Sequence, residues 1–135
     1  MEIELLERQS SELRKDIVEV CYHSKAGHVG GSLSAIDILN VLYFNELRID
    51  PNNPKMENRD RFILSKGHIA EALYVTLAKR GFFAYSELDN FSGYNTKYIG
   101  HPNNKVAGVE MNTGALGHGL AIGVGLAIAA KKMGQ

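Results

Sequence analysis

Five histidines are the side chains of this 135-residue chain with the clearest capacity for chemistry. Three of them follow a glycine in segments expected to be loops, in the pairs Gly27-His28, Gly67-His68 and Gly100-His101. Glycine beside histidine permits a tight turn and a close approach of a ligand to the backbone. Imidazole transfers protons near neutral pH and contacts phosphate groups. A single such histidine more often caps a helix or packs, but three in separate segments predict a shared site.

A metal centre is the competing interpretation of the same histidines. The spacing of His28, His68 and His101 contains no local pair of the kind that zinc sites use. Cys21 is the only cysteine, so no CxxC pair exists and no intrachain disulfide can form. We therefore disfavour zinc and expect a reduced, cytoplasmic compartment.

A glycine-rich segment, Thr113-Gly-Ala-Leu-Gly-His-Gly119, leads into the last expected helix. The free N–H groups and the dipole at such a helix start favour an anion or a cofactor. The pattern is one residue short of the Thr-Gly-x-x-x-Gly-x-Gly loop of short-chain dehydrogenases, so a dinucleotide is one candidate. The acidic ribose-binding residue would then fall about 20 residues later, at or beyond the last residue. A dinucleotide-binding oxidoreductase is therefore disfavoured but stays open.

Several elements are expected to position these groups. Apolar residues at helical spacing predict helices over 3–21, from Ser34 to the Asp50-Pro51 turn, from Ile69 to Gly81 and from Gly117 to Met133, with a short helical turn over 86–90. Ser34 and Asp37 form a start similar to a capping box. The short apolar runs Phe62–Ser65 and Val109–Asn112 predict strands. A sheet of so few strands is incomplete, so we expect its partners outside this sequence.

The composition excludes several functional classes. Fifteen Lys and Arg balance fifteen Asp and Glu, so the chain lacks the basic excess of a nucleic-acid-binding domain. The apolar share of 44% fits a folded core rather than a disordered tail. The charged start shows no signal-peptide core, and the longest apolar stretch, Leu120–Ala130, is too short to span a bilayer. We expect a globular protein with no membrane and no nucleic-acid partner.

Four segments, taken in order, resemble the amino-terminal part of the transketolases. They are Ala26-Gly-His-Val-Gly30, Asn58-Arg-Asp-Arg-Phe-Ile-Leu-Ser-Lys-Gly-His68, Gly100-His-Pro102 and Gly108-Val-Glu-Met-Asn-Thr-Gly-Ala-Leu-Gly-His-Gly119. Each segment is short, but their order and spacing together are specific and cover the chain from about Leu13 to Gly134. The sequence Ser-Lys-Gly-His is most similar to that of the split transketolases, whose two halves are separate polypeptides.

This resemblance implies a fold and an activity. The fold is the α/β thiamine-diphosphate-binding fold, a parallel sheet flanked by helices. It is expected here as a truncated and mostly helical piece, with residues 1–135 forming the N-terminal part of that domain without an internal boundary. The implied activity is transfer of a two-carbon ketol unit between sugar phosphates, with thiamine diphosphate as cofactor.

The resemblance also implies that parts of the machinery lie elsewhere. Mg²⁺ is expected with the cofactor, but the family's Gly-Asp-Gly motif does not occur here, so its ligands are expected outside this segment. The glutamate that activates the aminopyrimidine comes from a partner chain in split enzymes. We therefore expect a homo-oligomer and/or a separate C-terminal transketolase subunit. We also expect the isolated chain to have no activity.

The resemblance assigns roles residue by residue. His28 and His101 match catalytic histidines that face the reacting ketol and handle its hydroxyl protons. His68 matches the histidine at the cofactor diphosphate, and Gly31 a small residue near the aminopyrimidine. The segment that contacts the cofactor is matched by Gly114, Ala115 and Leu116.

The chain departs from the family pattern at three positions. Val29 replaces a common proline, Ala115 the proline of Gly-Pro-Leu, and His118 a common glutamine. None removes a functional side chain, although His118 adds an imidazole near the cofactor loop. Two alternatives stay open beside the oxidoreductase: a deoxyxylulose-phosphate synthase-like enzyme, which the Gly100-His-Pro102 segment disfavours, and a non-catalytic binding or assembly module.

Overall fold

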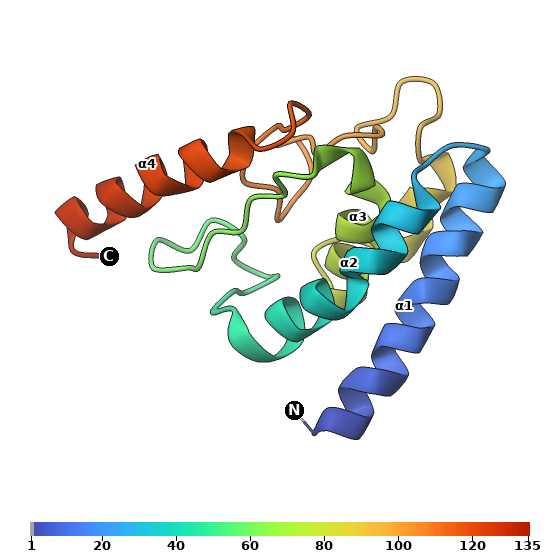
Figure 1. The fold of residues 1–135 in the computed structure, drawn as a ribbon, viewed down its shortest axis with the longest axis horizontal. Coiled ribbons are helices and arrows are strands. Elements are labelled where there is room, and N and C mark those ends of the chain that lie inside the picture. Colours follow the sequence, from blue (N-terminus) through green and yellow to red (C-terminus); the bar gives the residue numbers. More distant parts are fainter. Residues whose placement is uncertain (1) are drawn as a thin grey trace.

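A computed structural model describes residues 2–135, which form four α-helices and three short helical turns. Helices α1 (Ile3–Ser24), α2 (Val29–Val41) and α3 (Ala70–Arg80) pack on one another, and α4 (His118–Met133) stands apart from them (Figure 1). The turns are the π-helical η1 (Leu42–Glu46) and the 3₁₀-helical η2 (Gly67–Ile69) and η3 (Tyr85–Asn90). The chain between these elements is irregular.

Helix α1 confirms the predicted helix over 3–21 and extends it to Ser24. Its buried apolar side chains, Leu13, Ile17, Val20 and Cys21, stand at positions i, i+4, i+7 and i+8, so they form one stripe that faces α2 and α3. The other positions carry mainly charged and polar residues, as expected for a helix with one face in water. The helix ends where the backbone turns left-handed.

Helix α3 is the centre of the core. Every residue from Ala70 to Ala78 is buried, and the helix contacts α1, α2 and η3, so this stretch is mainly apolar around the whole helix, with Glu71 and Thr76 as its buried polar residues. Gly81 ends it in the left-handed region, with φ of 98°, and donates its N–H to the carbonyls of Leu77 and Ala78 at 3.1 and 3.0 Å. The predicted end of this helix at Gly81 is therefore confirmed.

Helix α2 begins earlier than its sequence predicts. The expected start at Ser34 is wrong, because the helix begins at Val29. The Ser34 hydroxyl donates to the carbonyl of Gly31 at 2.7 Å, inside the helix, instead of capping its end. The expected capping partner, Asp37, forms an ion pair with Arg14 of α1. Ser34 and Asp37 therefore lie inside α2 and do not cap its start.

Neither predicted strand forms within residues 2–135. Phe62–Ser65 has no regular secondary structure, because no second strand in this part of the chain pairs with its backbone. Its polar groups contact loops instead: the carbonyl of Leu64 accepts a hydrogen bond from the Thr113 hydroxyl at 2.6 Å. The segment 109–112 is irregular as well. The described part of the chain is thus wholly helical in its regular structure.

Helix α4 exposes almost all of its surface. Gly119 is its only buried residue among those described, and its N–H donates to the Ser65 hydroxyl at 3.2 Å. Large apolar side chains point outward, including Leu120, Val124 and Ile128 at 74%, 53% and 53% exposure. In residues 2–135, no helix has both the length and the apolar character needed to cross a membrane. The face of α4 is therefore an uncovered apolar surface.

Candidate functional site

Two of the three glycine-flanked histidines lie side by side. His68 lies in η2, directly before α3, and His28 is the N-cap residue of α2. Their rings meet edge to face, with centroids 5.1 Å apart and planes at 74°. His28 is exposed and His68 half-buried. The fold thus presents two imidazoles from distant segments at one point of the surface.

The third histidine is connected to the same point through a loop. A Cβ on Gly67 would lie 2.8 Å from Thr113 Oγ1 and 2.9 Å from the nitrogen of Gly114, so only glycine allows this approach. The ring of His101 lies beside Gly114, with its Cδ2 atom 3.4 Å from where a Cβ would stand. The Tyr74 hydroxyl of α3 donates to the carbonyl of His101 at 2.8 Å. The core helix therefore holds His101 beside the loop that approaches Gly67, the residue before His68.

Gly31 faces the same segment from the first turn of α2. A Cβ there would come within 2.8 Å of Ile69 Cγ2 and 3.5 Å of Lys66 Cε. The Lys66 ammonium donates to the carbonyl of Gly31 at 3.2 Å and to the hydroxyl of Ser34 at 3.1 Å. Lys66 was not among the residues that the sequence singled out, although it stands two positions before His68. It adds a positive charge to the histidine site.

A second residue that sequence reasoning missed is Glu71. Its side chain is completely buried, at 0% exposure. Its Oε1 atom accepts hydrogen bonds from the backbone N–H of His28 at 2.5 Å and from the Ser32 hydroxyl at 2.8 Å. The available signal was a single acidic residue in a stretch, 69–78, that carries no other charge. Glu71 thus connects the interior of the core to the turn that carries His28.

Cys21 lies beneath the same turn. A Cβ on Gly27, which has φ of 123°, would lie 2.5 Å from the Cys21 sulfur, so the turn covers the thiol closely. Burial, and secondarily the negative charge of Glu71, raises the pKa of Cys21 to about 11. The thiol is therefore protonated and shielded at neutral pH.

Cys21 should react slowly with alkylating reagents. Because the thiolate is the reactive species, a pKa of about 11 predicts alkylation by iodoacetamide roughly two orders of magnitude slower than for a free cysteine at about pH 8. Mass spectrometry of the folded chain measures the rate, and the chain unfolded in urea is the control. Labelling of the folded chain at the rate of the unfolded one would contradict the burial described here.

The remaining predicted residues lie at the edge of the site. Ala115 and Leu116 are exposed in the loop between Gly114 and α4, and Leu116 is 68% exposed. His118 begins α4 and is exposed. His23 lies apart on α1, 3.9 Å from Glu19. Among residues 2–135, no three His, Cys, Asp or Glu side chains gather in a way that could hold a metal ion.

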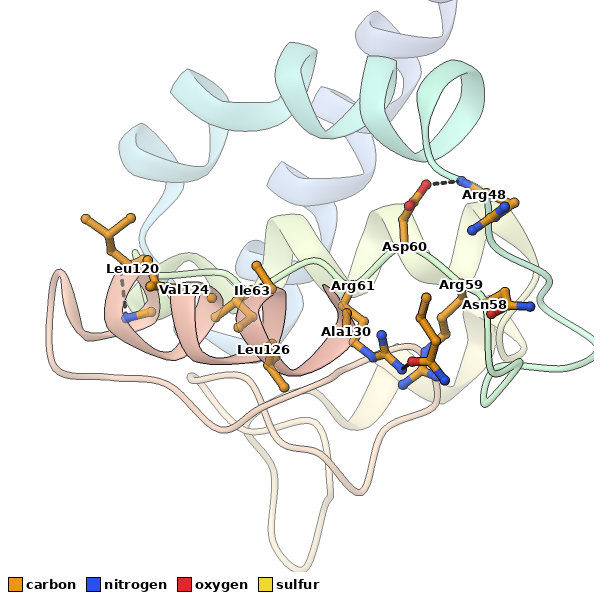
Figure 2. Close-up of a pocket in the computed structure, with 15 residues that line it drawn as sticks. Arg48, Asn58, Arg59, Asp60, Arg61, Ile63, Leu120, Val124, Leu126 and Ala130 are labelled. Carbon is orange, nitrogen blue, oxygen red and sulfur yellow. Dashed lines mark hydrogen bonds between the residues drawn. The ribbon is translucent and has the colours of Figure 1, made fainter. Parts of the chain in front are cut away.

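A large cavity lies next to the histidine site but does not include the histidines. It has a volume of about 640 Å³ and separates α4 from the segment 58–65. In the view of Figure 2, Leu120, Val124 and Ile63 line one end of the cavity, and Arg59 and Arg61 lie toward the other end, near Ala130. Ser65 and Gly119, which join α4 to the body, line it as well.

One ion pair stabilises the loop that precedes Gly114 in the chain. The guanidinium of Arg59 donates twice to the carboxylate of Glu110, at 2.7 Å for both bonds, and both side chains are 16% exposed. Hydrogen bonding to Glu110 raises the pKa of Arg59. Paired, bidentate bonds of this kind fix geometry as well as charge. The pair therefore fastens the loop of Thr113 to the segment that precedes Ser65.

Comparison with known proteins gives matches along nearly the whole chain. Residues 7–135 match the family described as transketolase, thiamine diphosphate binding domain. The chain is 51% identical to an apulose-4-phosphate transketolase subunit of Phocaeicola vulgatus, over 97% of this chain and 47% of that protein. It is 42% identical to a 6-deoxy-6-sulfo-D-fructose transketolase subunit of a Clostridium species, over 92% and 46% respectively.

Comparison with solved structures also finds transketolases. The crystal structure of transketolase from Campylobacter jejuni superposes with a TM-score of 0.91 at 38% sequence identity, covering 98% of this chain and 21% of that one. The chain spans about half the length of the curated subunits that it matches. Its helices therefore correspond to the first part of a larger α/β domain.

Proposed function

Because the chain belongs to the transketolase family, in its thiamine-diphosphate-binding domain, we propose that it supplies one part of the site for two-carbon ketol transfer between sugar phosphates. One observation supports this most strongly. His28, His68 and His101 come from three distant segments and converge around the contact between Gly67 and Gly114. We further propose that residues 1–135 are one piece of the domain without an internal boundary, because α1, α2 and α3 share one core.

The residues present fit thiamine diphosphate as the cofactor. A diphosphate needs cationic and N–H donors at an accessible point. The site offers the imidazole of His68, the ammonium of Lys66 and the first-turn N–H groups of α2, which have no acceptor within their own helix. A Cβ on Gly30 would meet nothing within 4 Å, so the backbone there is open to a ligand. When bound, the cofactor supplies the carbanion and then stores the electrons of the ketol unit.

The chain's own residues divide this work between binding and proton transfer. His68 and Lys66 bind the diphosphate, while the loop Gly114, Ala115 and Leu116, together with Gly31, bounds the cofactor's rings. His28 and His101, both exposed at the mouth of the site, hold or move the hydroxyl protons of the sugar. The contact of the His28 ring with His68 supports this division, because the proposed proton-transfer group then lies next to the proposed cofactor-binding group.

The described residues do not fit a magnesium site by themselves, since no group of three suitable ligands gathers among residues 2–135. We propose that the Mg²⁺ ligands belong to the part of the domain that the longer relatives have and that residues 1–135 do not contain. The same part of the domain would cover the cavity beside α4. A homo-oligomer and/or a separate C-terminal transketolase subunit would complete the site, as the word subunit in the names of two relatives suggests.

A product assay tests this function. The subunit that contains this sequence, assembled with its C-terminal partner, thiamine diphosphate and Mg²⁺, should transfer a ketol unit from a ketose phosphate to an aldose. The isolated chain should show no transfer. Condensation with pyruvate instead of a ketose phosphate would favour a deoxyxylulose-phosphate synthase. Failure of the assembly with every ketose phosphate donor would contradict the proposal, as would ketol transfer by the isolated chain.

Substituting His68 should weaken binding of the cofactor rather than lower the rate of the chemical step. In the assembly, His68→Ala removes one charge-assisted contact to the diphosphate, which is worth about 1.5–3 kcal/mol, or roughly a ten- to hundredfold rise in the dissociation constant. Isothermal titration with thiamine diphosphate and Mg²⁺ measures it. His23→Ala, which lies on α1 outside the site, is the matched control and should leave the constant unchanged. Equal constants for His68→Ala and wild type would contradict the assigned role.

A further inference from the structure

The interior of the described part of this protein holds one acidic side chain that has no cation beside it. Glu71 is fully buried, and its hydrogen bonds come only from neutral groups, the N–H of His28 and the hydroxyl of Ser32. Its second oxygen, Oε2, has no hydrogen-bond partner among residues 2–135. Burying such a group without full pairing is costly, so a purely structural position would be filled better by an apolar residue.

The position of the carboxyl group reduces this cost. Glu71 lies in the first turn of α3, and the same carboxyl group faces the start of α2. The N-termini of two helices carry partial positive charge, which stabilises a negative group located between them. The carboxyl group therefore joins the two helix starts from which His68 and His28 project.

The turn that this carboxyl group holds is conformationally demanding. Lys25 has φ of 55° and Gly27 has φ of 123°, and His28 lies outside the ordinary helical and extended regions, at φ of −121° and ψ of 69°. A backbone in such states persists only where its surroundings fix it. The hydrogen bond from the His28 N–H to Glu71 fixes the last residue of the turn, and that from the Ser32 hydroxyl fixes the helix that follows.

We propose that Glu71 is a positioning residue, whose buried carboxyl group fixes the turn 25–28 and thereby holds the His28 ring against His68. The effect of this positioning on turnover rests on the function proposed above, but the positioning itself does not. Glu71 does not touch the ligand; it acts through the backbone of His28. The required feature is an acceptor oxygen at this position, so a glutamine should replace it and an alanine should not.

The first test observes the histidine rings directly in the full chain. With ring-labelled histidine, NMR cross-relaxation between His28 and His68 should be present in wild type, retained in Glu71→Gln and lost in Glu71→Ala. The alkylation rate of Cys21 gives an independent reading, because the same turn covers its thiol. This rate should rise at least about tenfold in Glu71→Ala and much less in Glu71→Gln, which removes the charge of Glu71 but keeps the turn over the thiol.

A matched control separates positioning from general loss of stability. Asn40 is also fully buried and polar, and its amide donates to the carbonyl of Leu6 and the hydroxyl of Ser10, joining α1 to α2 away from the histidines. Asn40→Ala should destabilise the fold but leave the ring contact and the Cys21 rate unchanged. An intact ring contact in Glu71→Ala would overturn the proposal. So would its loss in Asn40→Ala, or a failure of Glu71→Gln to preserve it.

The second test uses the complete assembly with thiamine diphosphate. Glu71→Ala should lower kcat at least about tenfold and change the cofactor dissociation constant less than about threefold, with Glu71→Gln restoring most of the rate. An unchanged kcat in Glu71→Ala would overturn the effect on turnover. If the wild-type assembly shows no ketol transfer, the proposed function fails, while the ring contact and the Cys21 rate still decide the role of Glu71.

Discussion

Alanine in place of His28 or His101 lowers kcat of the complete assembly by about 10²–10⁴-fold, the usual contribution of a positioned acid or base. This is the largest effect on activity that we expect from any single substitution in the chain. The physical reason is that each imidazole stands at the exposed mouth of the site and replaces solvent as the proton acceptor and donor for a sugar hydroxyl. Neither ring serves the hydrophobic core.

The measurement is steady-state turnover together with the cofactor dissociation constant. We expect the constant to change by less than about threefold, because His68 and Lys66 rather than these two histidines bind the diphosphate. Unfolding by urea should give nearly the wild-type midpoint, since exposed side chains contribute little to stability. A variant that loses its stability and activity together, or that keeps its full kcat, would contradict the role of that histidine.

The second large effect is expected at Gly67. In Gly67→Ala, the added Cβ would stand 2.9 Å from the backbone nitrogen of Gly114 and 2.8 Å from Thr113 Oγ1. Because one of these atoms belongs to the backbone, the loop must move away as a whole. Overpacking of this kind costs about 1–3 kcal/mol. Since His101 lies beside Gly114, the shift also separates it from the other histidines, and we expect cofactor binding to weaken at least about tenfold.

A second glycine provides the matched control. A Cβ on Gly125, in the middle of α4, would meet nothing within 4 Å. Gly125→Ala should therefore stabilise α4 itself slightly, by about 0.5–1 kcal/mol, since alanine favours the helix, and should leave the urea midpoint of the core unchanged. Urea unfolding measures the stability of both variants, and calorimetry measures their affinity for the cofactor. If Gly67→Ala resembled Gly125→Ala in both experiments, the close approach of η2 to the loop 113–114 would not exist in solution.

Local patterns in the sequence were sufficient for those elements whose boundaries are set locally. The stripe of α1 and the glycine at the end of α3 both gave correct predictions, because each depends on residues at most four positions apart. The start of α2 could not be predicted in this way. It depends on the carboxyl group of Glu71, 43 positions after His28 in the chain. The capping pair Ser34 and Asp37 had the correct residue types but found other partners.

The strands failed for a related reason. A strand exists only when a neighbour pairs with its backbone, and Phe62–Ser65 has no such neighbour in residues 2–135. For the site, the glycine-flanked histidines predicted a shared site, and the structure has the His28 ring against that of His68 and the His101 ring beside Gly114, which approaches Gly67. Lys66 and Glu71 were missed because a single charged residue gives no periodic signal. Only the folded arrangement shows that the position of Glu71 has no access to water.

The detachment of α4 has a consequence for how the protein loses its structure. Since α4 contacts none of the helices α1, α2 and α3 within residues 2–135, it can unwind without exposing the core around α3. The free energy of opening α4 and the global free energy of unfolding are then separate quantities, and the first is much the smaller. Amide hydrogen exchange should therefore proceed rapidly along α4 while α3 stays protected. A partner that covers Leu120 and Val124 would raise the free energy of opening α4 toward the global free energy of unfolding. The rate of amide exchange in α4 would then report whether the partner is bound.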